Sequence, residues 1–143
     1  NAQFRRIALL EEATNASCSP CASANPKLQQ FFEHNFGGVI SVRYHAWWPG
    51  TDPMYSENTA DNSDRINYYG INGVPTYMMD GAVKGMPNNP VQLANEMWND
   101  ISTLTPLWVN VTASANGGNY DVTVKIISSE TIDASNLYLR TAV

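Results

Sequence analysis

Two cysteines, Cys18 and Cys21, are the residues with the clearest chemical potential in this chain of 143 residues, and no other cysteine accompanies them. A Cys-x-x-Cys pair suits thiol–disulfide exchange, because one sulfur can attack a substrate disulfide and the other can then resolve the mixed disulfide. Ser17 is positioned to cap a helix that begins near Cys18, and Pro20 suits its first turn. The partial positive charge at that helix end favours a thiolate on Cys18, which we expect to be exposed, with Cys21 more buried.

The same two cysteines also allow a structural disulfide or half of a metal site. Zinc would need a second pair of ligands, for which the sequence offers only His34 and His45, expected at a helix end and in a strand. Haem attachment requires a histidine directly after Cys21, where Ala22 stands. The pattern favours a redox pair, and the structural disulfide remains the main alternative.

Two adjacent carboxylates, Glu11 and Glu12, end the first expected strand. Neighbouring strand residues point to opposite faces, so we expect only one of them to face the core. A buried carboxylate near the dithiol would have a raised pKa and could carry a proton to or from Cys21. The alternative is that both side chains are exposed at the strand end.

A proline in the sequence Gly73-Val74-Pro75-Thr76 enters a later strand. Proline is allowed at the first residue of a strand, and its peptide bond is either trans, which local sequence favours, or cis. The segment 47–64 adds Trp47 and Trp48, which either bind an apolar polypeptide beside the active site or form, with Tyr55, the core of the segment itself.

Hydrophobic periodicity predicts the elements that position these residues. A β-α-β-α-β-β-α unit is expected over residues 4–104. Its helix after the cysteines should place Leu28, Phe31, Phe32 and Phe36 in the core. The first expected elements are a strand at 5–12, a helix from about Cys18 to Gly37-Gly38 and a strand at 39–46. A short helix capped by Asp61 or Ser63 and ended by Gly70 should follow. Strands at 74–79 and 82–85, joined by Asp80-Gly81, then lead to a helix from Asn89 or Pro90 to Thr103.

After Pro106 the period changes to two, which predicts β structure alone over residues 106–143. Two strands meet at a turn over 116–119, and a third strand is expected at 136–143. We expect this extension to be the beginning of a truncated β-sandwich. Because two or three strands leave an open edge and an apolar face, it should pack on the first unit or pair with a second copy of the chain.

Composition excludes several other classes of protein. Hydrophobic residues make up 43% and charged residues 15% of the chain, which excludes an intrinsically disordered protein. No apolar run approaches the roughly 20 residues that a membrane-spanning helix needs. The net charge is −5 and lysine occurs only three times, so no basic cluster suggests nucleic-acid binding. The chain starts at Asn1 without an initiator methionine, so we expect a processed start or a cloning scar, with any membrane anchoring through a missing N-terminal segment.

In combination, these residues resemble the thioredoxin superfamily over about residues 4–104. Cys18 matches the nucleophilic cysteine of that family and Cys21 the resolving one. Pro20 matches the proline before the second cysteine, and Pro26 matches the proline that kinks the active-site helix. The implied fold is α/β and thioredoxin-like, with a central mixed sheet flanked by helices and followed by a short all-β extension.

The resemblance also covers two positions outside the cysteine motif. Glu12, six residues before Cys18, falls where thioredoxins hold a buried acid, and Pro75 falls where they hold a cis-proline that faces the active site. The start Leu-Leu-Glu-Glu, the stretch from Tyr68 to Thr76 and the trailing β segment are most similar to a secreted bacterial subgroup of outer-membrane-associated thioredoxin-like proteins.

The sequence departs from the thioredoxin pattern in three places. Ser19 replaces the glycine of the usual Gly-Pro dipeptide, so the reduction potential of thioredoxin does not transfer. Ser17 replaces the tryptophan that usually precedes the first cysteine. The 54 positions from Cys21 to Pro75 exceed the spacing of compact thioredoxins, and the excess lies between Trp47 and Asp64.

The resemblance implies a thiol–disulfide oxidoreductase that acts on protein thiols and disulfides outside the cytoplasm of a bacterium, in the periplasm or at the outer membrane or cell surface. Cys18 would attack, Cys21 would resolve and Glu12 would move protons. Val74 and Pro75, with Trp47 and Trp48, would bind the substrate chain. No metal or organic cofactor is implied. The alternative function is a non-catalytic cell-surface binding module with a structural disulfide.

Overall fold

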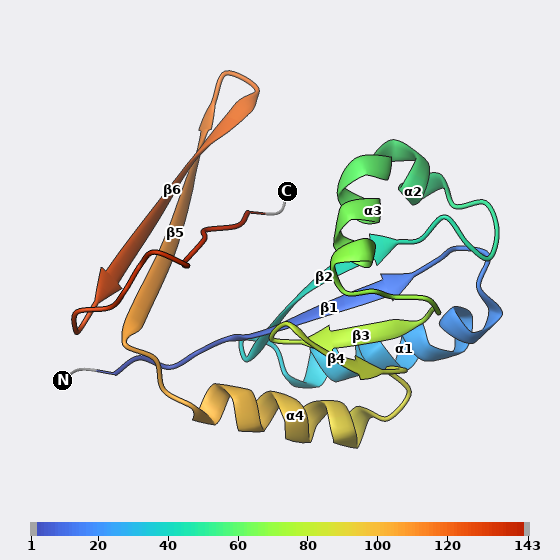
Figure 1. Ribbon diagram of the computed structural model, residues 1–143, viewed down its shortest axis with the longest axis horizontal. Coiled ribbons are helices and arrows are strands. Elements are labelled where there is room, and N and C mark those ends of the chain that lie inside the picture. Colours follow the sequence, from blue (N-terminus) through green and yellow to red (C-terminus); the bar gives the residue numbers. More distant parts are fainter. Residues whose placement is uncertain (1–2, 142–143) are drawn as a thin grey trace. The chain divides into compact units, whose positions relative to one another are not determined.

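Figure 1 shows the computed structural model, which describes residues 3–141. In chain order the elements are β1 (Ala8–Thr14), α1 (Ser19–His34), β2 (Val39–His45), α2 (Pro53–Glu57), α3 (Thr59–Tyr68), β3 (Thr76–Met79), β4 (Ala82–Gly85), α4 (Pro90–Ser102), β5 (Leu107–Asn116) and β6 (Asn119–Ser128). The order predicted for the first unit is therefore found, with α2 as an addition that was not predicted.

The central sheet has four strands in the order β2-β1-β3-β4. β1 and β2 are parallel, and α1 forms the crossover connection that a parallel pair requires. β3 runs antiparallel to both β1 and β4. The sheet is therefore mixed, with β1 at its centre, and the chain leaves the end of β1 directly toward the two cysteines.

Helices cover both faces of this sheet (Figure 1). On one face, α1 and α4 pack on a core cluster that includes Leu10, Leu28 and Met97. On the other face, Ile66 of α3 packs against Ala13 and Ala46. Because both faces of β1 are covered, its residues do not alternate between apolar and polar along the strand.

The first strand starts later than predicted. It covers Ala8–Thr14 instead of residues 5–12, because its pairing with β2 begins at Ala8 and Val39. Phe4, four residues before this strand, instead forms an isolated antiparallel β-bridge with Thr105. Phe36, predicted in the core, is 96% exposed because α1 ends at His34.

The segment between β2 and β3 contains two helices instead of one. Asp52 caps α2 and Asn58 caps α3, so the predicted caps Asp61 and Ser63 are wrong. Both lie inside α3. The two observed caps each accept hydrogen bonds from free backbone N–H groups of the first turn, which is the role of an N-cap residue.

The turn at Asp80-Gly81 is confirmed, with φ of 45° and 85° at the two residues. Positive φ at both central positions is typical of the tight turn that joins antiparallel strands. The carboxylate of Asp80 also accepts a hydrogen bond from the backbone N–H of Leu9, at 2.7 Å. This contact ties the turn to the central strand.

The chain divides into two compact units, one made of residues 7–101 and one made of the N-terminal residues to Arg6 with those from Ser102 onward. The second unit contains the predicted hairpin β5–β6. The third strand predicted at 136–143 is wrong: residues 136–141 are irregular, and 142–143 lie outside the described residues. A Leu137 N–H bond to Ala134 forms a local turn there. Whether this extension begins a larger β module, and whether it pairs with a second copy, stay predictions.

No helix in the described part of the chain combines the length and the apolar character needed to cross a membrane.

Candidate functional site

Cys18 and Cys21 form a disulfide at the N-terminus of α1. The N-cap of this helix is Cys18 itself, and its sulfur accepts a hydrogen bond from the backbone N–H of Cys21 at 3.1 Å. The predicted cap, Ser17, is therefore wrong. The Ser17 hydroxyl instead donates to the carbonyl oxygen of Thr51 at 2.7 Å, away from the helix.

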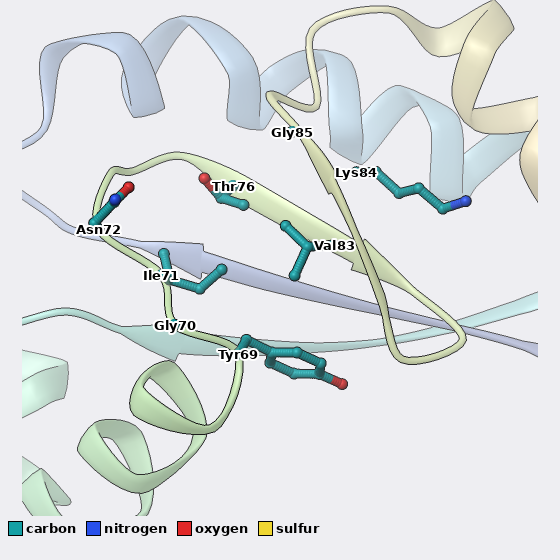
Figure 2. Close-up of a pocket in the computed structure, with 8 residues that line it drawn as sticks. All are labelled: Tyr69, Gly70, Ile71, Asn72, Thr76, Val83, Lys84 and Gly85. Carbon is teal, nitrogen blue, oxygen red and sulfur yellow. The ribbon is translucent and has the colours of Figure 1, made fainter.

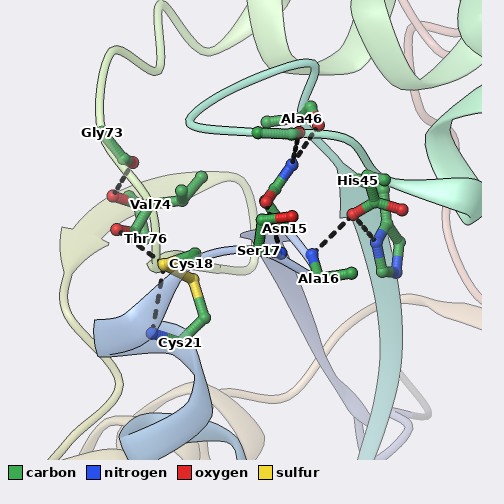
Figure 3. The surroundings of a disulfide bond; sticks show 12 residues. Asn15, Ala16, Ser17, Cys18, Cys21, His45, Ala46, Gly73, Val74 and Thr76 are labelled. Carbon is green, nitrogen blue, oxygen red and sulfur yellow. Dashed lines mark hydrogen bonds and ion pairs between the residues drawn. A yellow bond between two sulfur atoms is a disulfide. The ribbon is translucent and has the colours of Figure 1, made fainter.

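Both cysteines are buried in this disulfide form. Cys18 is 4% exposed, which contradicts the expected exposure, and Cys21 is 1% exposed. The loop before β3 contributes to the burial of Cys18, because the carbonyl oxygen of Val74 lies 3.5 Å from its sulfur (Figure 3). A sulfur in a disulfide has no proton to donate, so this is a close contact that a reduced thiol could turn into a hydrogen bond.

The peptide bond between Val74 and Pro75 is cis, which confirms the expectation from the thioredoxin resemblance over the trans bond that local sequence favours. In the same loop, the hydroxyl of Thr76 donates to the carbonyl oxygen of Gly73 at 2.8 Å. A second cis bond precedes Pro49, and no feature of the sequence predicted it.

Glu12, the carboxylate that the sequence predicted as a buried acid, is buried with no exposed surface. Its oxygen Oε2 forms an ion pair with Nε of Arg43 at 3.0 Å, although the N–H is not aligned with that oxygen as in a hydrogen bond. Burial raises the pKa of Glu12 to about 7, against the opposing effect of the Arg43 charge. A carboxyl group with this pKa can both take and give a proton near neutral pH.

Glu11 is buried as well, so the expectation that only one of the two carboxylates faces the core is wrong. It points to the opposite face of the sheet, where Arg65 donates two hydrogen bonds to it, at 2.7 and 3.0 Å, and the hydroxyl of Tyr69 donates a further one. Burial alone would raise the pKa of Glu11, but these hydrogen bonds outweigh it and lower the pKa. Glu11 therefore belongs to a structural ion pair.

The loop before Cys18 is held by Asp52, which sequence reasoning did not single out. Its carboxylate accepts hydrogen bonds from the backbone N–H of Ala16 and from Nδ1 of His45, both at 2.7 Å. It also caps α2 through the N–H groups of Met54 and Tyr55. Burial would raise the pKa of Asp52, but the hydrogen bonds lower it, so the group stays ionised.

Further hydrogen bonds tie the same loop to the start of the 47–64 segment (Figure 3). The side-chain amide of Asn15 donates to the carbonyl oxygens of Ala46 at 2.9 Å and Gly50 at 3.0 Å. Gly50 lies so close to Ser17 that an added Cβ would stand 2.9 Å from the Cβ of Ser17. The start of the 47–64 segment thus packs directly against the loop that precedes Cys18.

The two tryptophans of this segment have different surroundings. Trp48 is half-buried and packs on the cluster of Ala13, Ala46 and Ile66, which Val74 also joins. Trp47 is 46% exposed and contacts the Trp48 ring edge-on, with the centroids 4.4 Å apart. Trp48 therefore belongs to a small core, whereas Trp47 presents its ring to solvent.

Surface pockets in the unit of residues 7–101 lie close to the predicted site residues. A pocket of about 270 Å³ adjoins the cysteine loop, and Thr14, whose buried hydroxyl has no hydrogen-bond partner among residues 3–141, is part of its lining. The other residues of this lining are Asn15, Ala16, Asn25, Arg43, His45 and Met54. The second pocket, about 230 Å³, lies where the loop before β3 faces β4, with Ile71, Thr76 and Val83 among its walls (Figure 2).

Among residues 3–141, no three histidine, cysteine or acidic side chains are grouped so that they could hold a metal ion. His45, which the sequence offered as a ligand, is instead engaged with Asp52.

The comparisons with known proteins give structural matches only. No protein-family model and no curated protein sequence matches the chain. HBP35 of Porphyromonas gingivalis superposes with a TM-score of 0.65 at 16% identity, over 80% of this chain and 39% of that one. Protein AGR_C_4864 from Agrobacterium tumefaciens superposes with a TM-score of 0.57 at 17% identity, over 86% of this chain and 58% of that one.

The thiol:disulfide interchange protein of the thioredoxin family from Chlorobium tepidum matches with a TM-score of 0.48 at 15% identity, over 69% of this chain and 93% of that one. By comparison, this chain spans only about two fifths of the length of HBP35 and somewhat over half of the length of AGR_C_4864. The fold is thioredoxin-like, a mixed four-stranded sheet with flanking helices followed by an antiparallel hairpin, and it carries a Cys-x-x-Cys disulfide.

Proposed function

We propose that the chain is a thiol–disulfide oxidoreductase that acts on protein substrates through Cys18 and Cys21. The observation that carries this proposal is the hydrogen bond from the backbone N–H of Cys21 to the sulfur of Cys18 at the start of α1. A sulfur in this position is stabilised as a thiolate by the N–H group and by the helix dipole. A purely structural disulfide has no need of such stabilisation.

In the reductive direction, the thiolate of Cys18 attacks one sulfur of a substrate disulfide, and the second substrate sulfur leaves with the electron pair and is protonated by solvent. The thiol of Cys21 then loses its proton and attacks the sulfur of Cys18. The bond between Cys18 and the substrate breaks, and the substrate sulfur that Cys18 had attacked is released as a thiolate. The substrate has gained two electrons, the chain has become the disulfide form, and an external dithiol reduces it again.

Glu12 is the group we assign to the proton of Cys21. It is buried on the α1 face of the sheet, and its pKa of about 7 allows proton transfer in both directions near neutral pH. The cysteine pair and this acid belong to consecutive elements, β1 and α1, which fix their relative positions.

Val74, Pro75 and Trp47 form the proposed substrate-binding surface, and Trp48, packed on the small core, supports the ring of Trp47. The carbonyl oxygen of Val74 lies next to the sulfur of Cys18, so a substrate chain that pairs with this loop would bring its disulfide to the attacking atom. The exposed ring of Trp47 can contact apolar side chains of an unfolded substrate.

We place this activity outside the cytoplasm of a bacterium, on the strength of the sequence resemblance, where protein disulfides persist as substrates. The chemistry requires no metal or organic cofactor. The second candidate function is a binding module with a structural disulfide, and the burial of Cys18, which is only 4% exposed, favours it.

The deciding experiment is reduction of insulin by dithiothreitol, followed as turbidity, together with the reduction potential of the pair measured in glutathione buffers. We expect catalysed precipitation of insulin and complete loss of catalysis in Cys18→Ser. A potential below about −300 mV with no catalysis would instead support the structural disulfide.

A further inference from the structure

Asn25 is the side chain that links the buried acid to the cysteine helix. It lies on α1, one turn after Cys21. With the amide turned so that its nitrogen faces these neighbours, it donates to Oε1 of Glu12 at 2.9 Å and to the carbonyl oxygen of Cys21 at 3.1 Å. The amide orientation follows from its neighbours, because two acceptors face the same end of the side chain and only the NH₂ end can donate.

The neighbouring side chains of Arg43 and Tyr77 do not donate to Oε1 of Glu12, the oxygen that Asn25 contacts. Arg43 of β2 reaches the opposite oxygen, Oε2, as an ion pair without an aligned hydrogen bond. Tyr77, the register partner of Glu12 on β3, directs its hydroxyl to Glu96 instead, at 2.7 Å. The Asn25 amide thus supplies an aligned hydrogen bond to Oε1, the carboxylate oxygen that Arg43 does not reach.

We propose that Asn25 is a positioning residue that holds the carboxylate of Glu12 against the first turn of α1 and favours its ionised form. This proposal rests on the proposed redox function, in which Glu12 accepts the proton of Cys21. A hydrogen bond donated to a carboxylate stabilises the charged form and so opposes the effect of burial. Asn25 also joins Arg43 in the lining of the 270 Å³ pocket, so part of this residue faces a space that solvent can enter.

The proton transfer that Asn25 serves has a simple balance. The carboxylate of Glu12 takes the proton from the thiol of Cys21 as that sulfur attacks Cys18. The new sulfur–sulfur bond replaces the bond between Cys18 and the substrate, and Glu12 later returns the proton to solvent. Without the Asn25 amide, Glu12 would stay protonated to higher pH, and a protonated carboxyl group cannot accept the Cys21 proton.

The direct test is the titration of Glu12 in the oxidised chain, followed by the ¹³C shift of its carboxyl carbon from pH 4 to 10 and assigned by its absence in Glu12→Gln. We expect Asn25→Ala to raise the midpoint by about one pH unit, a tenfold change in the protonation equilibrium. Asn25→Asp, which keeps the size of the side chain but adds a like charge, should raise it at least as far. Gln29→Ala is the control, because the exposed amide of Gln29, on the same helix, donates to Glu33 and not to Glu12.

A midpoint in Asn25→Ala within about 0.3 units of the unsubstituted chain would overturn the proposal. The rising limb of the pH profile of insulin reduction should move upward by the same amount as the titration, and a fixed limb in an active enzyme would overturn the catalytic part. An unsubstituted chain without activity would defeat the proposed function itself. The titration, which needs no turnover, would still decide whether Asn25 sets the protonation of Glu12.

Discussion

The backbone N–H of Cys21 donates to the sulfur of Cys18, so the first cysteine is both the N-cap of α1 and one half of the disulfide. This relationship makes the two sulfurs chemically unequal. Cys18 accepts the N–H of Cys21 and lies at the positive end of the helix, whereas Cys21 lies inside the first turn and is the more buried of the two. Stabilisation of the thiolate and burial both favour Cys18 as the more acidic thiol.

Glu12 should make the stability of the oxidised chain depend on pH. Its pKa rises from 4.5 to about 7 on folding, so the native state binds the proton more tightly than the unfolded state. The stabilisation is complete below pH 4.5 and is lost as the pH rises through about 7. In urea unfolding, the unsubstituted chain should lose about 3 kcal/mol more than Glu12→Gln between pH 4.5 and pH 8. Parallel pH curves for the two proteins would show that Glu12 has no raised pKa.

The ion pair of Glu11 and Arg65 should have the opposite pH dependence. The hydrogen bonds of Glu11 lower its pKa by more than burial raises it. The ion pair therefore stabilises the folded chain above the unfolded pKa of 4.5, and this stabilisation is lost as the pH falls through the lowered pKa. Arg65→Met should cost about 3 kcal/mol at pH 7, because it leaves a buried carboxylate without its cation. The cost should shrink in acid, where Glu11 becomes neutral. Arg140→Met, at an exposed position, is the control, and an equal loss of stability in both variants would contradict the structural role.

Gly50 should not tolerate a side chain. A Cβ at this position would stand 2.9 Å from the Cβ of Ser17 and 3.1 Å from its hydroxyl oxygen, so Gly50→Ala should destabilise the chain by about 1–3 kcal/mol in urea unfolding. Gly73→Ala is the matched control, because an added Cβ there would meet nothing within 4 Å. Combining Gly50→Ala with Ser17→Gly should recover part of the loss. If Gly50→Ala and Gly73→Ala had the same stability, the close contact between the 47–64 segment and the cysteine loop would be disproved.

The sequence predicted those parts of the fold that depend on local pattern. The alternation around Glu11 and Glu12 placed the two carboxylates on opposite faces of a strand, and the Asp80-Gly81 dipeptide indicated the tight turn. The burial of Glu11 could not be predicted in this way, because it depends on α3 covering the second face and supplying Arg65. Local pattern describes one element and not the partner that packs on it.

The missed parts of the site come from long-range pairing. Arg43 reaches Glu12 because the β1–β2 register places them side by side, and no local signal gives that register. Asp52 contacts Ala16 across 36 positions of sequence. Asn25 is the exception, since its place one turn after Cys21 was readable once the helix was predicted.

The central claim, that Cys18 is the activated nucleophile of a redox pair, is tested most directly by alkylation of the reduced chain with iodoacetamide from pH 5 to 9, with each cysteine followed by mass spectrometry. We expect Cys18 to react with a midpoint of roughly 6–7.5 and Cys21 to react later. Cys18→Ser should abolish labelling near neutral pH, and Cys21→Ser should keep it and trap mixed disulfides with substrates. Equal labelling of both cysteines, with midpoints near the ~8.5 of an ordinary thiol, would contradict the claim and favour a structural disulfide.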